Sequence, residues 1–178
     1  SLGIDKIWRK KVRKTVNKVP HSRILDVATG TGDLAIALSK LENSKITGVD
    51  ISRKMLEVGV EKVKAKKLES QIELKYGDSL DLPFETETFD VVTVAFGVRN
   101  FEVIGKGLSE IARVLKPNGK IVVLEFSNPS KFPIKQIFNF YSRKMMPFFG
   151  KLFSNFQPKS VNKKNLAMLF IKSTKINV

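Results

Sequence analysis

Apolar residues occur along this chain in five short runs, separated by stretches in which they recur every three or four positions. The runs are rich in Val, Ile and Leu, as is typical of buried β-strands. We expect these strands to end at Ala28, Asp50, Asp78, Phe96 and Phe126. The stretches between them predict helices over about Asp33–Leu41, Arg53–Lys67 and Glu102–Leu115. Pro117 and Gly119 then predict a turn after the last of these helices.

Alternation of apolar strands with helices is typical of a mostly parallel sheet covered on both faces. The sequence therefore predicts an α/β fold with a doubly wound, Rossmann-like sheet, in one domain spanning residues 1–178. Residues 1–22 form a helix in this prediction, with one apolar stripe and a basic opposite face. The stripe consists of Ile4, Trp8, Val12, Val16 and Val19.

Charge is distributed unevenly along the chain, which carries a net +15 at pH 7. Residues 1–23 contain eight Lys and Arg and one acid, and residues 126–178 contain ten Lys and Arg and no acid. The predicted core between these ends is close to neutral. A nucleic-acid enzyme usually carries positive charge around its active cleft, so the basic ends do not favour a nucleic-acid partner.

Composition excludes several kinds of site. The chain has no Cys and a single His, so we expect no disulfide and no metal centre built on Cys or His. His21 precedes the first strand, where a surface-loop role is expected. No apolar run approaches the ~20 residues of a membrane span, and no signal peptide is evident, so a cytoplasmic location is the expectation.

Polar residues follow each of the first four strands, at the sheet edge where ligands of parallel sheets bind. The first group is "DVATGTGDLA", in which Gly30 and Gly32 permit a tight turn and close approach of a ligand. This pattern alone also fits an ordinary strand-to-helix turn. Asp26 makes the strand end negative, which suits a positively charged ligand better than a pyrophosphate.

Asp50 ends the second strand, where a carboxylate can accept both hydroxyls of a ribose. A helix N-cap is the alternative role, although Ser52 can cap the following helix unaided. Asp78 and Ser79 follow the third strand at the same edge, and Asp78 also fits a turn. A dinucleotide-binding enzyme would share these features, but 178 residues leave little room for its second nucleotide-binding half.

The chain resembles class I S-adenosylmethionine-dependent methyltransferases, and more narrowly the C-methyltransferases of menaquinone and ubiquinone biosynthesis. The segments that carry the resemblance are "SLGIDKIWRKKV", "ILDVATGTGDLAIAL", "GDSLDLPFETETFDVVTVAFGVRNF", "EIARVLKPNGKIVVLEFSNP" and "NFYSRKMMPFFGKL". The match covers about residues 1–154. Residues 157–178 do not align with the usual family ending, so the closing strands of the sheet are expected to be incomplete, although "AMLFIKST" can form one strand.

The resemblance implies S-adenosylmethionine as cofactor and a prenylated quinol, from the menaquinone or ubiquinone pathway, as methyl acceptor. The residues it implies for cofactor binding are Asp26, Ala28, Gly30, Thr31, Gly32, Asp50, Ile51, Asp78, Ser79 and Ala95. For catalysis it implies Arg99, as the cation that stabilises a phenolate, with Asn100 and Tyr141 orienting the ring hydroxyl. Glu125 is an alternative general base if burial raises its pKa.

Residues 127–156 combine seven Phe with five Lys and Arg and no acid. This composition suits docking on an anionic membrane that holds a lipid-tailed substrate, and it equally suits a lid helix packed on the sheet. We also leave open a homodimer, methylation of RNA or another small molecule, and a cofactor-binding remnant without activity.

Overall fold

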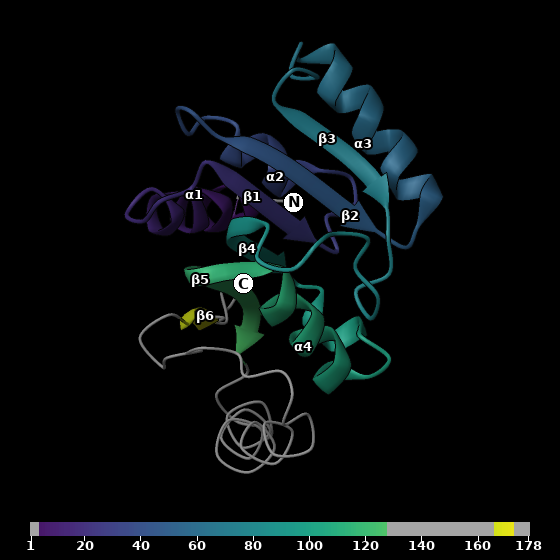
Figure 1. Ribbon diagram of the computed structural model, residues 1–178. Helices are drawn as coiled ribbons and strands as arrows, with labels where there is room; N and C mark the ends of the chain where they lie inside the picture. The colour runs from purple at the N-terminus through teal and green to yellow at the C-terminus, as the bar shows by residue number, and fades with distance from the viewer. Residues whose placement is uncertain (1–3, 128–165, 173–178) are drawn as a thin grey trace, which may run out of the picture.

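The computed structural model describes residues 4–127 and 166–172, which form one sheet with helices packed against it (Figure 1). The sheet has six strands in the order β3-β2-β1-β4-β5-β6, and neighbouring strands all pair in parallel. The strands are β1 (Arg23–Val27), β2 (Lys45–Asp50), β3 (Ile72–Tyr76), β4 (Phe89–Ala95), β5 (Leu115–Ser127) and β6 (Leu166–Lys172). The predicted strand in "AMLFIKST" is therefore present as β6.

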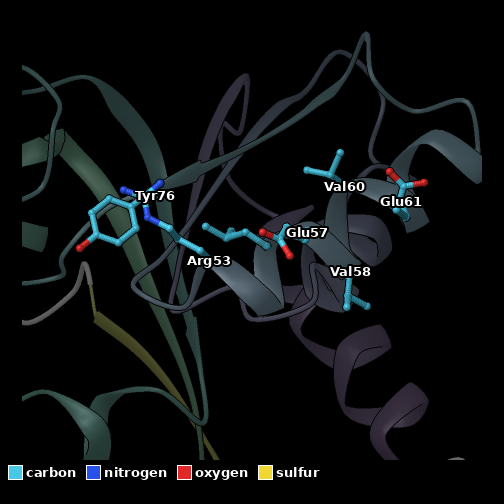
Figure 2. A pocket seen from close by; sticks show the side chains of 7 residues that line it. Arg53, Glu57, Val58, Val60, Glu61 and Tyr76 are labelled. Carbon is cyan, nitrogen blue, oxygen red and sulfur yellow. The ribbon is translucent and has the colours of Figure 1, made fainter.

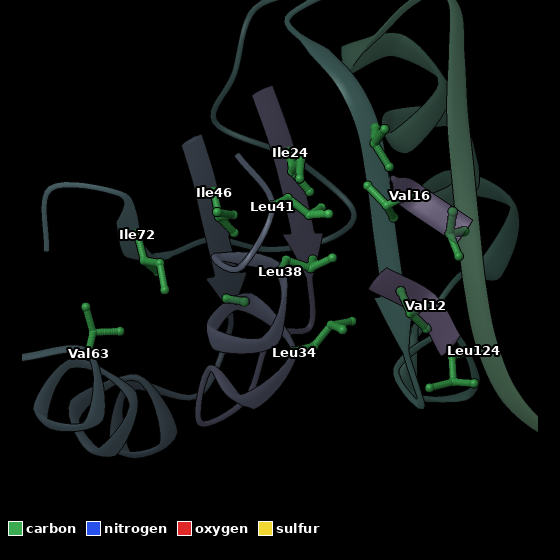
Figure 3. Packing of buried hydrophobic residues seen from close by; sticks show 13 residues of the cluster. Val12, Val16, Ile24, Leu34, Leu38, Leu41, Ile46, Val63, Ile72 and Leu124 are labelled. Carbon is green, nitrogen blue, oxygen red and sulfur yellow. The ribbon is translucent and has the colours of Figure 1, made fainter. Parts of the chain in front are cut away.

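Helices cover both faces of this sheet, as a doubly wound fold requires. They are α1 (Ile4–Val16), α2 (Asp33–Leu38), α3 (Arg53–Ala65) and α4 (Ile104–Val114), with a short 3-10 helix, η1, at Val98–Asn100. Apolar residues of the first three pack with Ile24 and Ile46 on one face, as Figure 3 shows. Residues of α4 pack with Leu25 and Val27 on the other. Successive residues of β1 thus enter opposite cores, which explains why the central strands are apolar throughout.

The apolar stripe of the N-terminal segment holds α1 against the sheet. Val12 and Val16 are fully buried, and Trp8 packs on Phe96 with 5.6 Å between ring centroids. The lysines between them, Lys10 and Lys14, are exposed. The structure therefore confirms the predicted amphipathic helix and brings it to the end of β4.

All four helices are shorter than predicted, whereas the strand ends agree with the prediction to within two residues. Helix α1 covers Ile4–Val16 of the predicted 1–22, and α4 covers Ile104–Val114 of the predicted Glu102–Leu115. Helix α2 stops at Leu38, where the Ser39 hydroxyl donates to the Ile36 carbonyl. Helix α3 stops at Ala65, two residues before the left-handed backbone of Lys67.

The predicted turn at Pro117 and Gly119 is wrong as a separate element, since these residues lie inside β5. Strand β5 pairs with β4 on both sides of them, at Phe89–Leu115 and again at Val91–Lys120. The additional residues form a bulge, in which Asn118 adopts a positive φ of 66°. The sequence "KPNG" therefore changes the register of the sheet without ending the strand.

The chain changes direction across the sheet between β1 and β4. From β1 it continues through α2 to β2 on one side, and from β4 it continues through α4 to β5 on the other. The carboxyl ends of β1 and β4 are therefore the point where the strand order reverses, and we call this edge of the sheet the crevice. This is the position where open α/β sheets bind their ligands.

Candidate cofactor site

The loop between β1 and α2 carries three residues in the left-handed conformation. Their φ values are 56° at Ala28, 58° at Gly30 and 72° at Gly32. The Thr29 amide donates to the Val49 carbonyl over 2.9 Å, which fastens the loop to β2. The loop is therefore folded tightly back on the sheet, and its glycines are placed where side chains would be strained.

The loop after β4 packs directly on this glycine loop. A Cβ atom added to Gly97 would lie 2.5 Å from the Cβ of Ala28, so only glycine allows this contact. The preceding residue, Phe96, has a φ of 58° although it is not glycine. Left-handed backbone at bulky residues is uncommon and clusters at functional sites. Left-handed backbone at a residue other than glycine thus follows both β1, at Ala28, and β4, at Phe96.

Asp50 connects the end of β2 to the glycine loop. Its Oδ2 accepts a hydrogen bond from the Gly30 amide and its Oδ1 accepts one from the Ser52 amide, each over 2.8 Å. Ser52 is itself the N-cap of α3, since its hydroxyl accepts from the Met55 amide. Asp50 is therefore not the cap of that helix. A carboxylate accepts about four hydrogen bonds, so these two contacts leave capacity for a diol.

Asp26 lies beneath the glycine loop and does not face the crevice. It is 1 % exposed, and its two oxygens accept hydrogen bonds from the hydroxyls of Thr29 and Thr93, each over 2.7 Å. Burial raises the pKa of Asp26 to about 6, although the two hydroxyls partly offset that rise. In this structure Asp26 braces the loop against β4, a role that the sequence did not indicate.

Three other residues predicted for cofactor binding, Thr31, Ile51 and Ala95, lie near the ends of the strands. The Thr31 hydroxyl accepts from Lys62 and donates to Asp33, so it joins α2 to α3. Ile51 is 63 % exposed directly beside Asp50. Ala95 is the last residue of β4 and is half-buried.

Asp78 follows β3 in a turn, as its alternative interpretation predicted. Its Oδ1 accepts a hydrogen bond from the Leu80 amide over 2.8 Å. The Gly77 amide donates to the Asp50 carbonyl over 3.1 Å, so the β3 exit stays beside the end of β2. Asp78 and Ser79 are both half-buried there. The turn thus places both residues near Asp50.

Arg99 and Asn100 lie in η1, beyond the exit of β4, and both are exposed. Arg99 Nη1 lies 3.7 Å from Glu125 Oε2, so the two candidates for the substrate hydroxyl form one ion pair. Tyr141, the remaining catalytic candidate, falls outside the residues that the structure describes. His21 lies at the amino end of β1, with Nδ1 2.6 Å from the Val19 carbonyl oxygen, at the opposite edge of the sheet.

Comparison with known proteins agrees with this geometry. The model of the ubiE/COQ5 methyltransferase family matches residues 1–161. The chain belongs to this family. A demethylmenaquinone methyltransferase of Bacteroides fragilis is 48% identical over 155 residues, which cover 86% of this chain and 63% of that protein. A ubiquinone/menaquinone biosynthesis C-methyltransferase of Geotalea daltonii is 44% identical over 158 residues, covering 88% and 67%.

Solved structures of methyltransferases share the fold. A SAM-dependent methyltransferase from Aquifex aeolicus superposes with a TM-score of 0.61 and 27% identity, covering 70% of this chain and 68% of that one. This member of the ubiE/COQ5 family spans about two thirds of the length of the curated relatives that it matches.

A pocket of about 500 Å³ lies along α3 (Figure 2). The Arg53 guanidinium stacks over the Tyr76 ring at one end of it, 4.2 Å from the ring centroid. Glu61 lines its far end. Because Tyr76 pairs with Asp50 across β3 and β2, this end of the pocket adjoins the candidate site. In the part of the chain that the structure describes, no three His, Asp or Glu residues group as metal ligands.

Replacing Asp26 with Asn tests whether this carboxylate is a buried brace. The pKa of about 6 in the folded protein exceeds the ordinary aspartate value of 3.8, so the folded state binds more protons between these pH values. Stability should therefore fall as pH rises through this window, by up to about 3 kcal/mol. Urea unfolding should show Asp26→Asn gaining stability relative to the wild type between pH 4 and pH 7. A stability difference that stays constant with pH would contradict this assignment.

Proposed function

We propose that this chain binds S-adenosylmethionine and methylates a ring carbon of a lipid-tailed hydroquinone. The observation that carries the proposal is the family match over residues 1–161, combined with the glycine loop and Asp50 beside the reversal of strand order at β1 and β4. The relatives are named for menaquinone and ubiquinone biosynthesis, which favours a demethylmenaquinol or a ubiquinone precursor over RNA as substrate.

The residues at the crevice fit this cofactor. A Cβ on Gly30 would lie 3.0 Å from the Met55 methyl at a left-handed φ of 58°, so glycine allows the loop to pack closely against α3. The carboxylate of Asp50 suits the two ribose hydroxyls, and the exposed side chain of Ile51 suits one face of the adenine ring. Asp78 and Ser79 lie where polar contacts to the base edge are made. Asp26 contributes by fixing the loop and places its negative charge behind it.

S-adenosylmethionine supplies a methyl group on a positively charged sulfur, which is already activated for transfer. The chain's own contribution is to hold the acceptor ring and to favour the ionised form of its hydroxyl. Arg99 provides a permanent positive charge at the exit of β4. Its side chain is 53 % exposed, so it can contact an aryl oxide. Asn100 and Tyr141 are the proposed groups that orient the hydroxyl.

Replacing Asp50 with Ala tests the cofactor site. The change removes the acceptor proposed for two ribose hydroxyls, so affinity for S-adenosylmethionine should fall by about 1–3 kcal/mol. Titration calorimetry measures this directly. Glu73→Ala is a suitable control, because Glu73 pairs with Lys75 on the exposed side of β3 and its loss should leave affinity unchanged. Unchanged affinity in a folded Asp50→Ala protein would contradict the site.

Replacing Arg99 tests the proposed reaction. Arg99→Ala should lower turnover of demethylmenaquinol by about 100-fold or more while cofactor affinity stays unchanged, because the charge acts on the ring oxygen. Arg99→Lys should restore only part of the rate, because lysine keeps the positive charge but lacks the planar guanidinium. The measurement is transfer of a labelled methyl group to demethylmenaquinol, to a ubiquinone precursor and to bulk RNA. Methylation of RNA alone would contradict the proposed substrate.

Peripheral contact with an anionic membrane is part of the same proposal, because the substrate carries a lipid tail. Helix α1 presents exposed Lys10, Lys11 and Lys14 beside Ile7, which is 65 % exposed. Within residues 4–127 and 166–172 no helix is long and apolar enough to cross a membrane. The Phe-rich range 127–156 lies almost wholly outside the described residues, so its membrane role rests on composition.

Vesicle binding tests this contact. Phosphatidylglycerol vesicles should bind the protein more strongly than phosphatidylcholine vesicles, and salt should weaken binding, because each cation near the surface contributes about 1 kcal/mol. Phe148→Ser with Phe149→Ser should release the protein in co-sedimentation although every charge remains. Lys10→Gln with Lys11→Gln should instead reduce the part of vesicle binding that salt weakens. Full binding by the Phe double variant would contradict insertion of aromatic side chains.

A further inference from the structure

Glu125 is a buried carboxylate with one oxygen left unpaired in the described structure. The residue is 6 % exposed, and its Oε1 has no hydrogen-bond partner among residues 4–127 and 166–172. Its other oxygen faces Arg99 at 3.7 Å, longer than the ~2.7–2.9 Å of a charge-assisted hydrogen bond. Buried polar atoms are almost always paired, so an unpaired carboxylate oxygen calls for a donor that the described residues do not supply.

Among the described residues, Asp5 Oδ1 in helix α1 is the other buried side-chain oxygen without a hydrogen-bond partner, whereas three carboxylates nearer the sheet are fully paired. Both oxygens of Asp26 accept hydrogen bonds from threonine hydroxyls. Asp90 accepts from the Arg23 amide and from Lys116. Glu110 accepts from the Leu82 amide and from Arg113. These three carboxylates are fully committed to the fold, whereas Glu125 is not.

The position of Glu125 is at the carboxyl end of the sheet, where substrates bind. The preceding residue, Leu124, pairs with Ala95, the last residue of β4. On the other side Glu125 is level with Phe170 of β6, so neither strand places an ionisable residue in register with it. Arg99 reaches it from η1, two residues after Gly97, which packs on the cofactor loop. The carboxylate and the guanidinium thus lie beside the crevice as one unit.

We propose that Glu125 accepts the proton of the substrate's ring hydroxyl and that Arg99 stabilises the resulting oxide. This inference rests on the function proposed above. The hydroxyl O–H bond breaks, its electron pair stays on the ring oxygen, and Glu125 Oε1 gains the proton. The ring carbon then bonds the methyl group of S-adenosylmethionine as the methyl–sulfur bond breaks, with the electron pair of that bond left on the sulfur and the ring oxygen becoming a carbonyl. The methylated carbon next loses its hydrogen to water as a proton, which restores the oxide. Glu125 then returns its proton to the ring oxygen and is a carboxylate again.

This division of labour suits the two side chains. A guanidinium stays protonated and is a poor base, but it stabilises an oxide well. A carboxylate is a competent base, and its unpaired oxygen is the acceptor that a ring hydroxyl needs. Their ion pair keeps both groups at one place before the substrate arrives. The ligand class that this pair recognises is an arene with a hydroxyl next to an unsubstituted ring carbon.

Turnover of Glu125→Gln is the first test. The change keeps size and removes the base, so turnover of demethylmenaquinol should fall about 100-fold or more, with cofactor affinity and melting temperature retained. Raising the pH ionises the substrate hydroxyl in solution, so the rate of the variant should rise about tenfold per pH unit below a phenolic pKa of ~10. A merely structural role for Glu125 would not produce that recovery. Asp90→Asn, at the opposite edge of the sheet, is the matched control and should keep wild-type turnover.

Ligand binding is the second test and needs no turnover. In the presence of S-adenosylhomocysteine, 2-naphthol should bind the wild type about tenfold more tightly than 2-methoxynaphthalene, which has no proton to donate. Glu125→Leu should abolish this preference while it leaves the affinity for the ether unchanged.

The outcomes separate this proposal from the general one. If the wild type methylates quinols and Glu125→Gln does so equally well, the role of Glu125 is wrong and the proposed function stands. A wild type that binds the cofactor without methylating any quinol overturns both. Loss of turnover without recovery at high pH, or an unchanged naphthol preference in Glu125→Leu, overturns the role as proton acceptor.

Discussion

The hydrogen bonds that Asp26 accepts from Thr29 and Thr93 connect the glycine loop to β4, at the point where the strand order of the sheet reverses. Thr29 belongs to the glycine loop and Thr93 to β4, so one buried carboxylate joins these two elements. The Thr29 amide adds a third connection, to β2. The left-handed turns at Ala28 and Phe96 and the close contact of Gly97 all depend on this connection remaining fixed.

This arrangement explains how a short chain builds the candidate site from few residues. Burying a carboxylate is unfavourable unless hydrogen bonds compensate for lost solvation, and here two neutral hydroxyls supply them. The result is a loop fixed to both β4 and β2. Asp50 adds a carboxylate beside this loop, and its bonds to Gly30 and Ser52 leave it capacity for further donors.

Much of the fold could be predicted from sequence because the signals were local. Apolar runs located all five core strands, and the 3.6-residue period located α1, where Val12 and Val16 are buried. The bulge at Asn118 was missed because it depends on pairing with β4, which no local pattern reveals. Asp26 was placed correctly at the end of a strand, but sequence does not tell which face a carboxylate occupies or that Thr93 lies beside it. The pairing of Arg99 with Glu125 needed the register of β4 and β5 for the same reason.

The contact between Trp8 and Phe96 gives the protein a built-in optical reporter. Trp8 is the chain's single tryptophan, and its neighbour Phe96 directly follows β4, the strand that forms one wall of the crevice. Indole emission shifts with the polarity around the ring, so the spectrum of the unlabelled protein reports how α1 is seated against that wall. Ligand binding at the crevice that moves Phe96 should therefore shift the emission maximum of Trp8.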